Sequence, residues 1–111
     1  MNYRWDIFCS VVDNFGDIGV TWRLAKQLVA EYNVTVRLFV DDLSAFARLC
    51  PKANSSLAQQ TQQGVEICLW HKPWQNVIPA DVVIEAFACT LPDSYVSAMA
   101  ERNKQKPILW L

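Results

Sequence analysis

The sequence predicts an α/β domain in which a parallel sheet carries helices on both faces. Short apolar runs rich in β-branched and aromatic residues alternate with longer segments of helical periodicity, as in βαβ units. The chain has 111 residues, 52% hydrophobic and 19% charged, so it can bury one core and fits one domain, residues 1–111. Its net charge of −1, with no run of either sign, argues against a nucleic-acid partner.

The first half of the chain predicts two strands and two helices. Residues 5–12 are rich in β-forming side chains and too short for an average helix, so they predict a buried strand. A helix is expected over 18–32, where apolar positions recur every four residues. These positions are Val20, Leu24 and Leu28. Residues 34–40 predict a second strand by their β-branched content, and 43–49 predict a short helix that Pro51 closes.

The second half continues the alternation after one ambiguous segment. Residues 52–63 are polar and rich in glutamine, which fits either an extended helix or an exposed surface segment. Strands are expected over 65–70 and 81–85, the latter short and apolar like a central parallel strand. A helix over 93–103 and a fifth strand at 107–111 follow. With right-handed crossovers these elements make a Rossmann-like sheet.

The two ends of the chain and its cysteines add further expectations. The first ten residues carry charges inside their apolar stretch, so they predict neither a secretory signal nor a membrane span, and a cytoplasmic protein is expected. The last residue, Leu111, falls within a strand signal, which predicts that the chain is the front part of a longer protein.

The four cysteines are widely spaced, and we expect them to be reduced and buried. They are Cys9, Cys50, Cys68 and Cys89. Cys68 and His71 have the spacing of half a zinc site, but no second close pair completes it, so no metal is predicted.

The turn after the first strand concentrates the informative residues. Two of the three glycines, Gly16 and Gly19, lie there at the start of a helix, where ligands bind in open α/β sheets. Asp13 and Asp17 flank this turn. Asp17 could cap the helix while Asp13 forms an Asx turn. Alternatively, the two carboxylates could bind a cation, for which a guanidinium is the natural partner.

A nicotinamide-dinucleotide site is a weaker alternative. The spacing of Gly16 and Gly19 lacks the third glycine of the dinucleotide motif, although Asp41 and Asp42 lie about twenty residues on, where a ribose-binding acid would sit. Glu85 ends a strand at the same edge and could line the crevice or be solvated. A non-catalytic protein-interaction domain is a third possibility.

The run 13–25 (DNFGDIGVTWRLA) closely resembles the N-terminal signature of bacterial elongation factor P arginine rhamnosyltransferases. Further similar segments are DDLSA at 41–45, LCP at 49–51, VVIEAFACTLP at 82–92 and KPILWL at 106–111. The resemblance implies the N-terminal, acceptor-facing half of a GT-B glycosyltransferase, whose other half holds most of the nucleotide-sugar site. Such enzymes transfer L-rhamnose from dTDP-β-L-rhamnose to an arginine of elongation factor P with inversion.

The same resemblance assigns roles to residues of the turn. Asp17 corresponds to the general base and Asp13 to a second essential carboxylate that orients the acceptor, although these two roles could be exchanged. The remaining residues expected to contact substrate are Asn14, Phe15, Gly16 and Gly19. Neither a metal nor a cofactor is expected, because the donor is a co-substrate. The chain alone is expected to be inactive.

Overall fold

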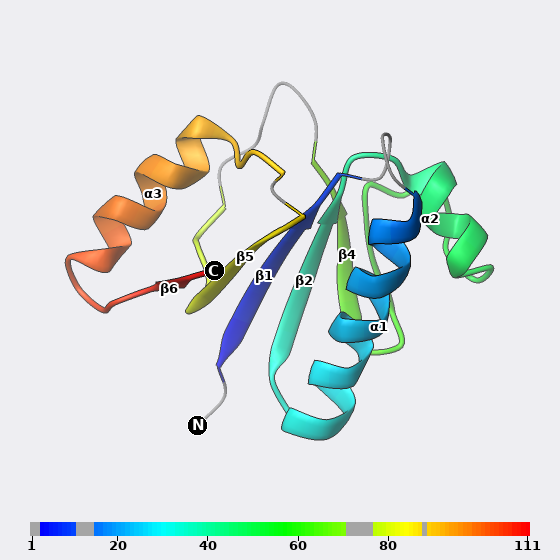
Figure 1. The fold of residues 1–111 in the computed structure, drawn as a ribbon, viewed down its shortest axis with the longest axis horizontal. Coiled ribbons are helices and arrows are strands. Elements are labelled where there is room, and N and C mark those ends of the chain that lie inside the picture. The colour runs from blue at the N-terminus through cyan, green and yellow to red at the C-terminus, as the bar shows by residue number, and fades with distance from the viewer. Residues whose placement is uncertain (1–2, 11–14, 71–76, 88) are drawn as a thin grey trace.

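A computed structural model describes residues 3–10, 15–70, 77–87 and 89–111 (Figure 1). The strands are β1 (Arg4–Cys9), β2 (Thr35–Val40), β3 (Gln59–Gln62), β4 (Val65–Leu69), β5 (Val82–Ala86) and β6 (Leu109–Trp110), and the helices are α1 (Phe15–Tyr32), α2 (Leu43–Leu49) and α3 (Asp93–Asn103). All these strands form one sheet with the order β3-β4-β2-β1-β5-β6.

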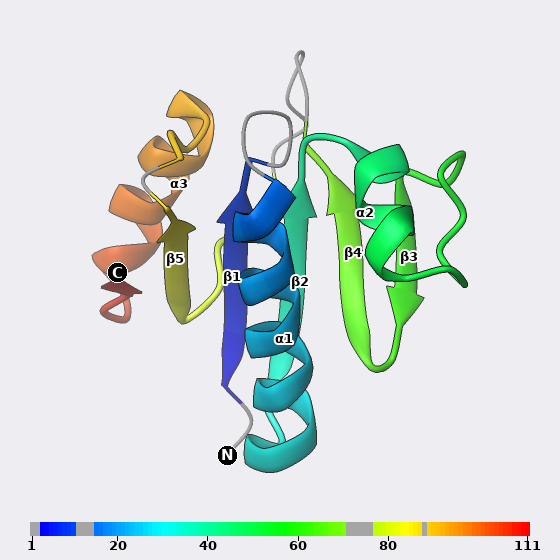
Figure 2. The same ribbon diagram turned by 45° about the vertical axis from the view of Figure 1, so that its right-hand side comes forward.

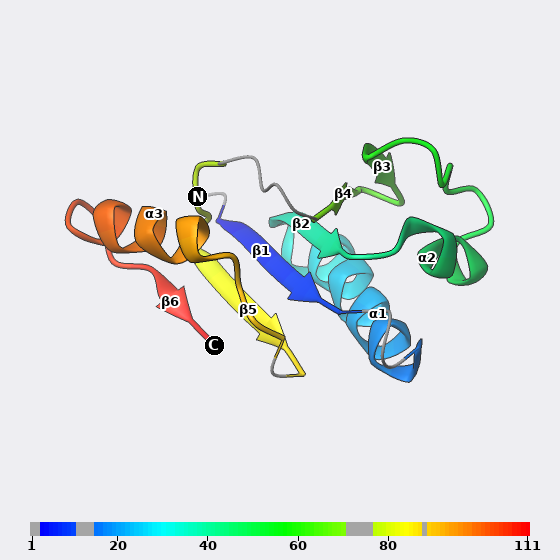
Figure 3. The same cartoon turned by 90° about the horizontal axis from the view of Figure 1, so that it is seen from above.

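Helices cover both faces of the sheet, as the sequence predicts. Helices α1 and α2 lie on one face and α3 lies on the other (Figures 2 and 3). The reason is topological: β1 connects to β2 on one side, whereas β5 connects to β6 in the opposite direction. Right-handed crossovers in opposite directions place their helices on opposite faces.

The core has two parts, one on each face, because side chains alternate along a strand. Ile7, Leu38 and Ile67 pack beneath α1 and α2. On the other face, Phe8 stacks on the ring of Phe39 with the ring centroids 4.4 Å apart. These buried strand positions hold the strand ends, and therefore the loops that follow them, in fixed relative positions.

Helix α1 is longer than predicted and buries a different stripe. It begins at Phe15 rather than at residue 18. The positions that face the core are Ile18, Trp22, Ala25 and Leu28. Val20 and Leu24, which the four-residue spacing assigns to the core, are exposed. The period of an α-helix is 3.6 residues, so an exact four-residue repeat drifts off the buried face.

The expectation of an entirely parallel sheet is wrong at one edge. The ambiguous segment 52–63 contains β3, which pairs antiparallel with β4. Gln63 and Gly64 both have positive φ, 51° and 81°, as a tight two-residue hairpin requires. At the other limit of the sheet β6 is shorter than the predicted strand 107–111, and β1 ends at Cys9 rather than at residue 12.

A buried ion pair ties β1, β2 and α3 together. The Asp6 carboxylate is fully buried and accepts bonds of 2.7 Å from both Nε and Nη2 of Arg37. It also accepts a 2.5 Å bond from the Tyr95 hydroxyl and one of 3.2 Å from the Ala80 amide. Burial, reinforced by the Asp6 charge, raises the pKa of Tyr95, which keeps its proton for this bond.

Candidate functional site

The candidate site lies where the carboxyl ends of β1, β2 and β5 meet. Strand order reverses between β1 and β5, because the chain leaves them toward opposite edges of the sheet. Helices α1 and α3 consequently diverge onto opposite faces (Figure 2). In open α/β sheets, this switch point at the carboxyl ends is where a ligand crevice forms.

Asp17 is half-buried in the first turn of α1, at the edge of this region. It does not cap the helix, because α1 begins two residues earlier, at Phe15. A carboxylate in the first turn still interacts favourably with the positive end of the helix dipole. The turn is anchored by Thr21, a buried residue whose hydroxyl donates a 2.8 Å bond to the Asp17 carbonyl oxygen.

The Thr21 hydroxyl also lies 3.6 Å from the Cys9 sulfur at the end of β1. Thr21 therefore links the helical turn that carries Asp17 to the strand end beneath it. Sequence reasoning did not single out Thr21. Its spacing of four residues from Asp17, on the buried side of the helix, is the signal that could have identified it.

Asp41 and Asp42 follow β2 and accept hydrogen bonds from different partners. The Asp42 side chain accepts a 3.0 Å bond from the Ala45 amide and caps α2. Asp41 instead accepts a 2.8 Å bond from the hydroxyl of Ser10, which follows β1. This pair joins two neighbouring strand ends and places a second carboxylate at the edge that carries Asp17.

Two buried thiols, Cys9 and Cys89, lie near the carboxylates of this edge. Burial raises the pKa of Cys9, and the charges of Asp17 and Asp41 raise it further. Burial likewise raises the pKa of Cys89 to about 12, with additional contributions from Cys9, Glu85 and Asp41. The thiols are therefore protonated and inert near neutral pH. Negative charge accumulates at this edge, which suits a cation better than a phosphate.

One glycine of the turn, Gly19, faces open space in the described structure. Gly16 is exposed, and Gly19 is half-buried within α1. A Cβ built at Gly19 would meet no atom within 4 Å, so packing within the described chain does not require glycine there. Because glycine costs helix stability, the open space is consistent with the close approach of another molecule.

The other predicted site residues are only partly placed. Asp13 and Asn14 lie outside the described residues, and Phe15 is the first residue of α1. Glu85 is half-buried in β5 in register with Phe8, so its side chain lies on the α3 face, away from α1. Of the predicted residues, the structure thus brings Asp17, Gly16 and Gly19 together on the first turns of α1.

The structure also bears on the cysteines and on metal binding. All four cysteines are free and buried, as predicted. Across the described residues, no group of three or more His, Cys, Asp or Glu side chains could hold a metal ion. His71 lies outside those residues. No helix in the described part of the chain is both long and apolar enough to span a bilayer.

Comparisons with known proteins identify one group of relatives. A family model described as "Elongation-Factor P (EF-P) rhamnosyltransferase EarP" matches residues 5–111. Proteins named protein-arginine rhamnosyltransferase from Pseudomonas putida, Pseudomonas aeruginosa and Neisseria meningitidis are 61%, 60% and 43% identical to the chain. These matches cover 100%, 96% and 95% of the chain, but only 29%, 28% and 27% of the respective relatives.

Proposed function

Because the chain belongs to the elongation factor P rhamnosyltransferase family, we propose that it is the N-terminal, acceptor-facing part of a protein-arginine rhamnosyltransferase. The match over residues 5–111 is the observation that carries this proposal. The whole enzyme would have the GT-B arrangement of two Rossmann-like halves. It would transfer L-rhamnose from dTDP-β-L-rhamnose to an arginine of elongation factor P, in the cytoplasm. The rest of the polypeptide would bind most of the donor.

The chemistry requires a carboxylate beside the acceptor nitrogen. A guanidinium is protonated at physiological pH, so its nitrogen is a poor nucleophile until a proton leaves. In the proposed reaction, a guanidinium nitrogen attacks the anomeric carbon, the bond from that carbon to the nucleotide oxygen breaks, and dTDP departs. The proton released from nitrogen goes to a carboxylate, for which we propose Asp17.

The described geometry supports Asp17 in this role. Its carboxylate accepts no hydrogen bond from any described residue, so it is available to a substrate, while Thr21 fixes the turn that carries it. The neighbouring charge of Asp41 adds to a negative surface that attracts the acceptor arginine. Asp13 would pair with the remaining guanidinium N–H groups and orient the nitrogen.

The small residues of the turn would shape the acceptor site. We propose that Phe15 and Gly16 form the wall that faces the sugar, and that Asn14 and Gly19 contact substrate. The scheme uses no metal and no cofactor, since the nucleotide sugar is a co-substrate. Because the rest of the polypeptide would bind most of the donor, the 111-residue chain alone should show no turnover and little affinity for the donor.

The test uses the full-length parent protein with elongation factor P and dTDP-β-L-rhamnose. The intact mass of the acceptor should increase by one deoxyhexose with the wild type and not with Asp17→Asn. Asp93→Asn is a matched control, because Asp93 is an exposed acid in the first turn of α3. A mass gain with Asp17→Asn would remove Asp17 from the mechanism. No gain with the wild type would overturn the proposed reaction.

The two other functional hypotheses predict different results, which binding measurements distinguish. A nicotinamide-dependent enzyme would bind the dinucleotide in a saturable titration and leave the acceptor mass unchanged. A non-catalytic interaction domain would bind elongation factor P with an affinity indifferent to Asp13→Asn and Asp17→Asn. Under the rhamnosyltransferase hypothesis, a variant that combines Asp13→Asn with Asp17→Asn should lose binding to elongation factor P.

A further inference from the structure

Phe87 follows the last residue of β5 in a backbone conformation that phenylalanine rarely adopts. Its φ is +54°, in the left-handed region. The Cys89 amide donates a 3.3 Å bond to the Ala86 carbonyl, which makes Phe87 the first central residue of a turn. Positive φ at that turn position favours glycine, asparagine or aspartate, and a bulky side chain there is strained. Because such strain gathers at functional sites, the Phe87 side chain should offer an advantage that offsets it.

Packing within the described chain does not supply this advantage. The Phe87 side chain is 56% exposed and belongs to neither of the two core clusters. By contrast, Phe8, Phe39 and Phe46 are at most 2% exposed. A phenylalanine normally stabilises a fold by burying its ring, so the exposed ring of Phe87 indicates a contact with another molecule.

The position of Phe87 is next to the candidate site. Ala86 is in register with Cys9, so Phe87 comes directly after the strand that neighbours the end of β1. The Cys89 thiol donates a 3.1 Å bond to a carbonyl of β1, which holds the turn against that strand. The first turns of α1, which carry Asp17, are linked to the same strand end through the Cys9 sulfur. Phe87 and Asp17 are therefore both anchored to the carboxyl end of β1.

The charge around Phe87 favours a cationic partner. Burial raises the pKa of Cys89, and the charges of Glu85 and Asp41 add to this rise, so the turn lies in a negative field. The face of an aromatic ring also attracts cations. A guanidinium suits both features, because its plane stacks on a ring while its N–H groups bond to a carboxylate.

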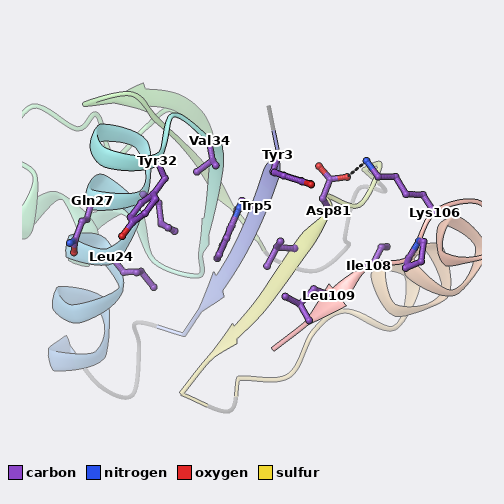
Figure 4. A pocket seen from close by; sticks show the side chains of 13 residues that line it. Tyr3, Trp5, Leu24, Gln27, Tyr32, Val34, Asp81, Lys106, Ile108 and Leu109 are labelled. Atoms are coloured by element: carbon purple, nitrogen blue, oxygen red, sulfur yellow. Dashed lines mark ion pairs between the residues drawn. The ribbon is translucent and has the colours of Figure 1, made fainter. Parts of the chain in front are cut away.

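A groove of about 930 Å³ beside α1 offers no comparable place for a guanidinium (Figure 4). Its lining includes Trp5 and Val82, at the beginnings of β1 and β5, so it lies at the opposite ends of the strands. Asp81 is the acid among its lining residues, and this carboxylate is already paired with Lys106 and Arg102. The negative charge that remains open to a cation is therefore at the edge shared by Asp17 and Phe87.

We propose that the Phe87 ring stacks on the guanidinium of the acceptor arginine and holds it beside Asp17. The inference rests on the proposed function, because it names a further acceptor contact of that site. The ring binds the guanidinium while it is still protonated, before Asp17 takes the proton. Its contribution is therefore to acceptor binding rather than to the rate of bond formation.

Steady-state kinetics of the full-length enzyme test this contact. Phe87→Leu keeps an apolar side chain without the ring, so KM for elongation factor P should rise about three- to thirtyfold while kcat changes less than about threefold. Phe87→Tyr keeps the ring and should hold KM within about twofold of the wild-type value. A raised KM for dTDP-β-L-rhamnose instead would assign the ring to the sugar. That result, or an unchanged KM for both substrates, overturns the proposal.

Thermal unfolding separates this role from a structural one. Phe87→Gly removes both ring and strain, so Tm should stay constant or rise by up to about 3 °C while KM for elongation factor P rises as in Phe87→Leu. Gln63→Gly is the matched control, since Gln63 has a φ of +51° but lies in the hairpin between β3 and β4. Its Tm should respond alike and its KM should not change. A clear fall of Tm in Phe87→Gly would make Phe87 structural and contradict the inference.

The wild type separates this inference from the proposed function. A mass gain of elongation factor P with the wild type, together with an unchanged KM in Phe87→Leu, would overturn the inference alone. No mass gain with the wild type would overturn the proposed function, and this inference with it.

Discussion

Two aspartates, one within β1 and one in the helix that follows it, have opposite environments. Asp6, near the beginning of the strand, is fully buried and accepts hydrogen bonds from Arg37, Tyr95 and the Ala80 amide. Asp17, beyond the end of the strand, is half-buried and receives no side-chain hydrogen bond from the described residues. The carboxylate of Asp6 thus has a full set of hydrogen-bond donors, whereas the carboxylate of Asp17 is open to a new partner.

The difference separates a structural role from a chemical one. A buried carboxylate whose oxygens are all satisfied has nothing left to offer a substrate, and its removal leaves the donors unpaired. A carboxylate held by its backbone, with its oxygens free of internal partners, can bind a cation and accept a proton. Asp6 should therefore control stability, and Asp17 should control activity. Substitutions can test this division in both directions.

The largest effect is expected on the rate with Asp17→Asn. Loss of the proposed base should lower kcat of the full-length enzyme about 10²- to 10⁴-fold. The free energy of unfolding should change by less than about 1 kcal/mol, because only an interaction with the helix dipole is lost. Steady-state kinetics and urea unfolding of the same preparation check both numbers. A large loss of stability would mean that Asp17, like Asp6, is structural.

Asp6→Asn should give the reverse result. Removing one charge of the buried pair leaves the Arg37 guanidinium without its partner, so the free energy of unfolding should fall by about 3–5 kcal/mol. Activity per folded molecule should change little, because Asp6 is fully buried and its hydrogen-bond partners, Arg37, Tyr95 and Ala80, do not belong to the candidate site. A double variant, Asp6→Leu with Arg37→Met, should recover much of the lost stability. Unchanged stability in Asp6→Asn would contradict the structural role.

The sequence predicts much of this fold but little of its side-chain network. Alternating apolar runs and helical periodicity identify the strands of the central sheet and all three described helices, with α2 and α3 at their observed bounds. They miss β3, because Gln59–Gln62 has the composition of a surface loop and becomes a strand only by pairing with β4. Local patterns carry no information about such pairing.

The candidate site and the buried ion pair of Asp6 show the same limit. The glycines and the position of Asp17 follow from the turn itself, since local spacing places them at a helix start. The bonds from Arg37 and Tyr95 to Asp6 join residues 31 and 89 positions away, which no short motif reveals. The Ser10–Asp41 bond, also across 31 positions, depends on the register of β1 and β2.

A third carboxylate, that of Asp81, tests whether hydrogen-bond donors around a carboxylate also make the stability of the fold depend on pH. The Arg4 amide, which donates a 2.8 Å bond, and the Arg102 guanidinium hold the pKa of Asp81 below its ordinary value. A pKa that is lower in the folded state stabilises the fold at pH values above the pKa of the unfolded state, about 3.9. This contribution is lost as the pH falls through the pKa of the folded state. Asp81→Asn should lower the free energy of unfolding at pH 7 by about 1–3 kcal/mol.

The difference between Asp81→Asn and the wild type should shrink below about pH 4 and vanish once Asp81 itself is protonated. Urea unfolding at a series of pH values from 7 downward measures this convergence. Glu101→Gln is a suitable control, because Glu101 forms an exposed ion pair with Lys104 and should change stability by at most about 1 kcal/mol. A pH-independent difference would mean that Asp81 acts by packing rather than by charge.

The smallest effects are expected at two glycines, and their signs should differ. Gly64 has a φ of +81°, and a Cβ there would lie 2.8 Å from Val29 Cγ1, so Gly64→Ala should lower stability by about 1–2 kcal/mol. Gly19→Ala meets no atom within 4 Å and should raise stability by about 0.5–1 kcal/mol. If the open space at Gly19 admits the acceptor arginine, the same substitution should raise KM for elongation factor P severalfold. Improved stability with unchanged acceptor kinetics would exclude Gly19 from the acceptor site, and the site would then begin at Asp17.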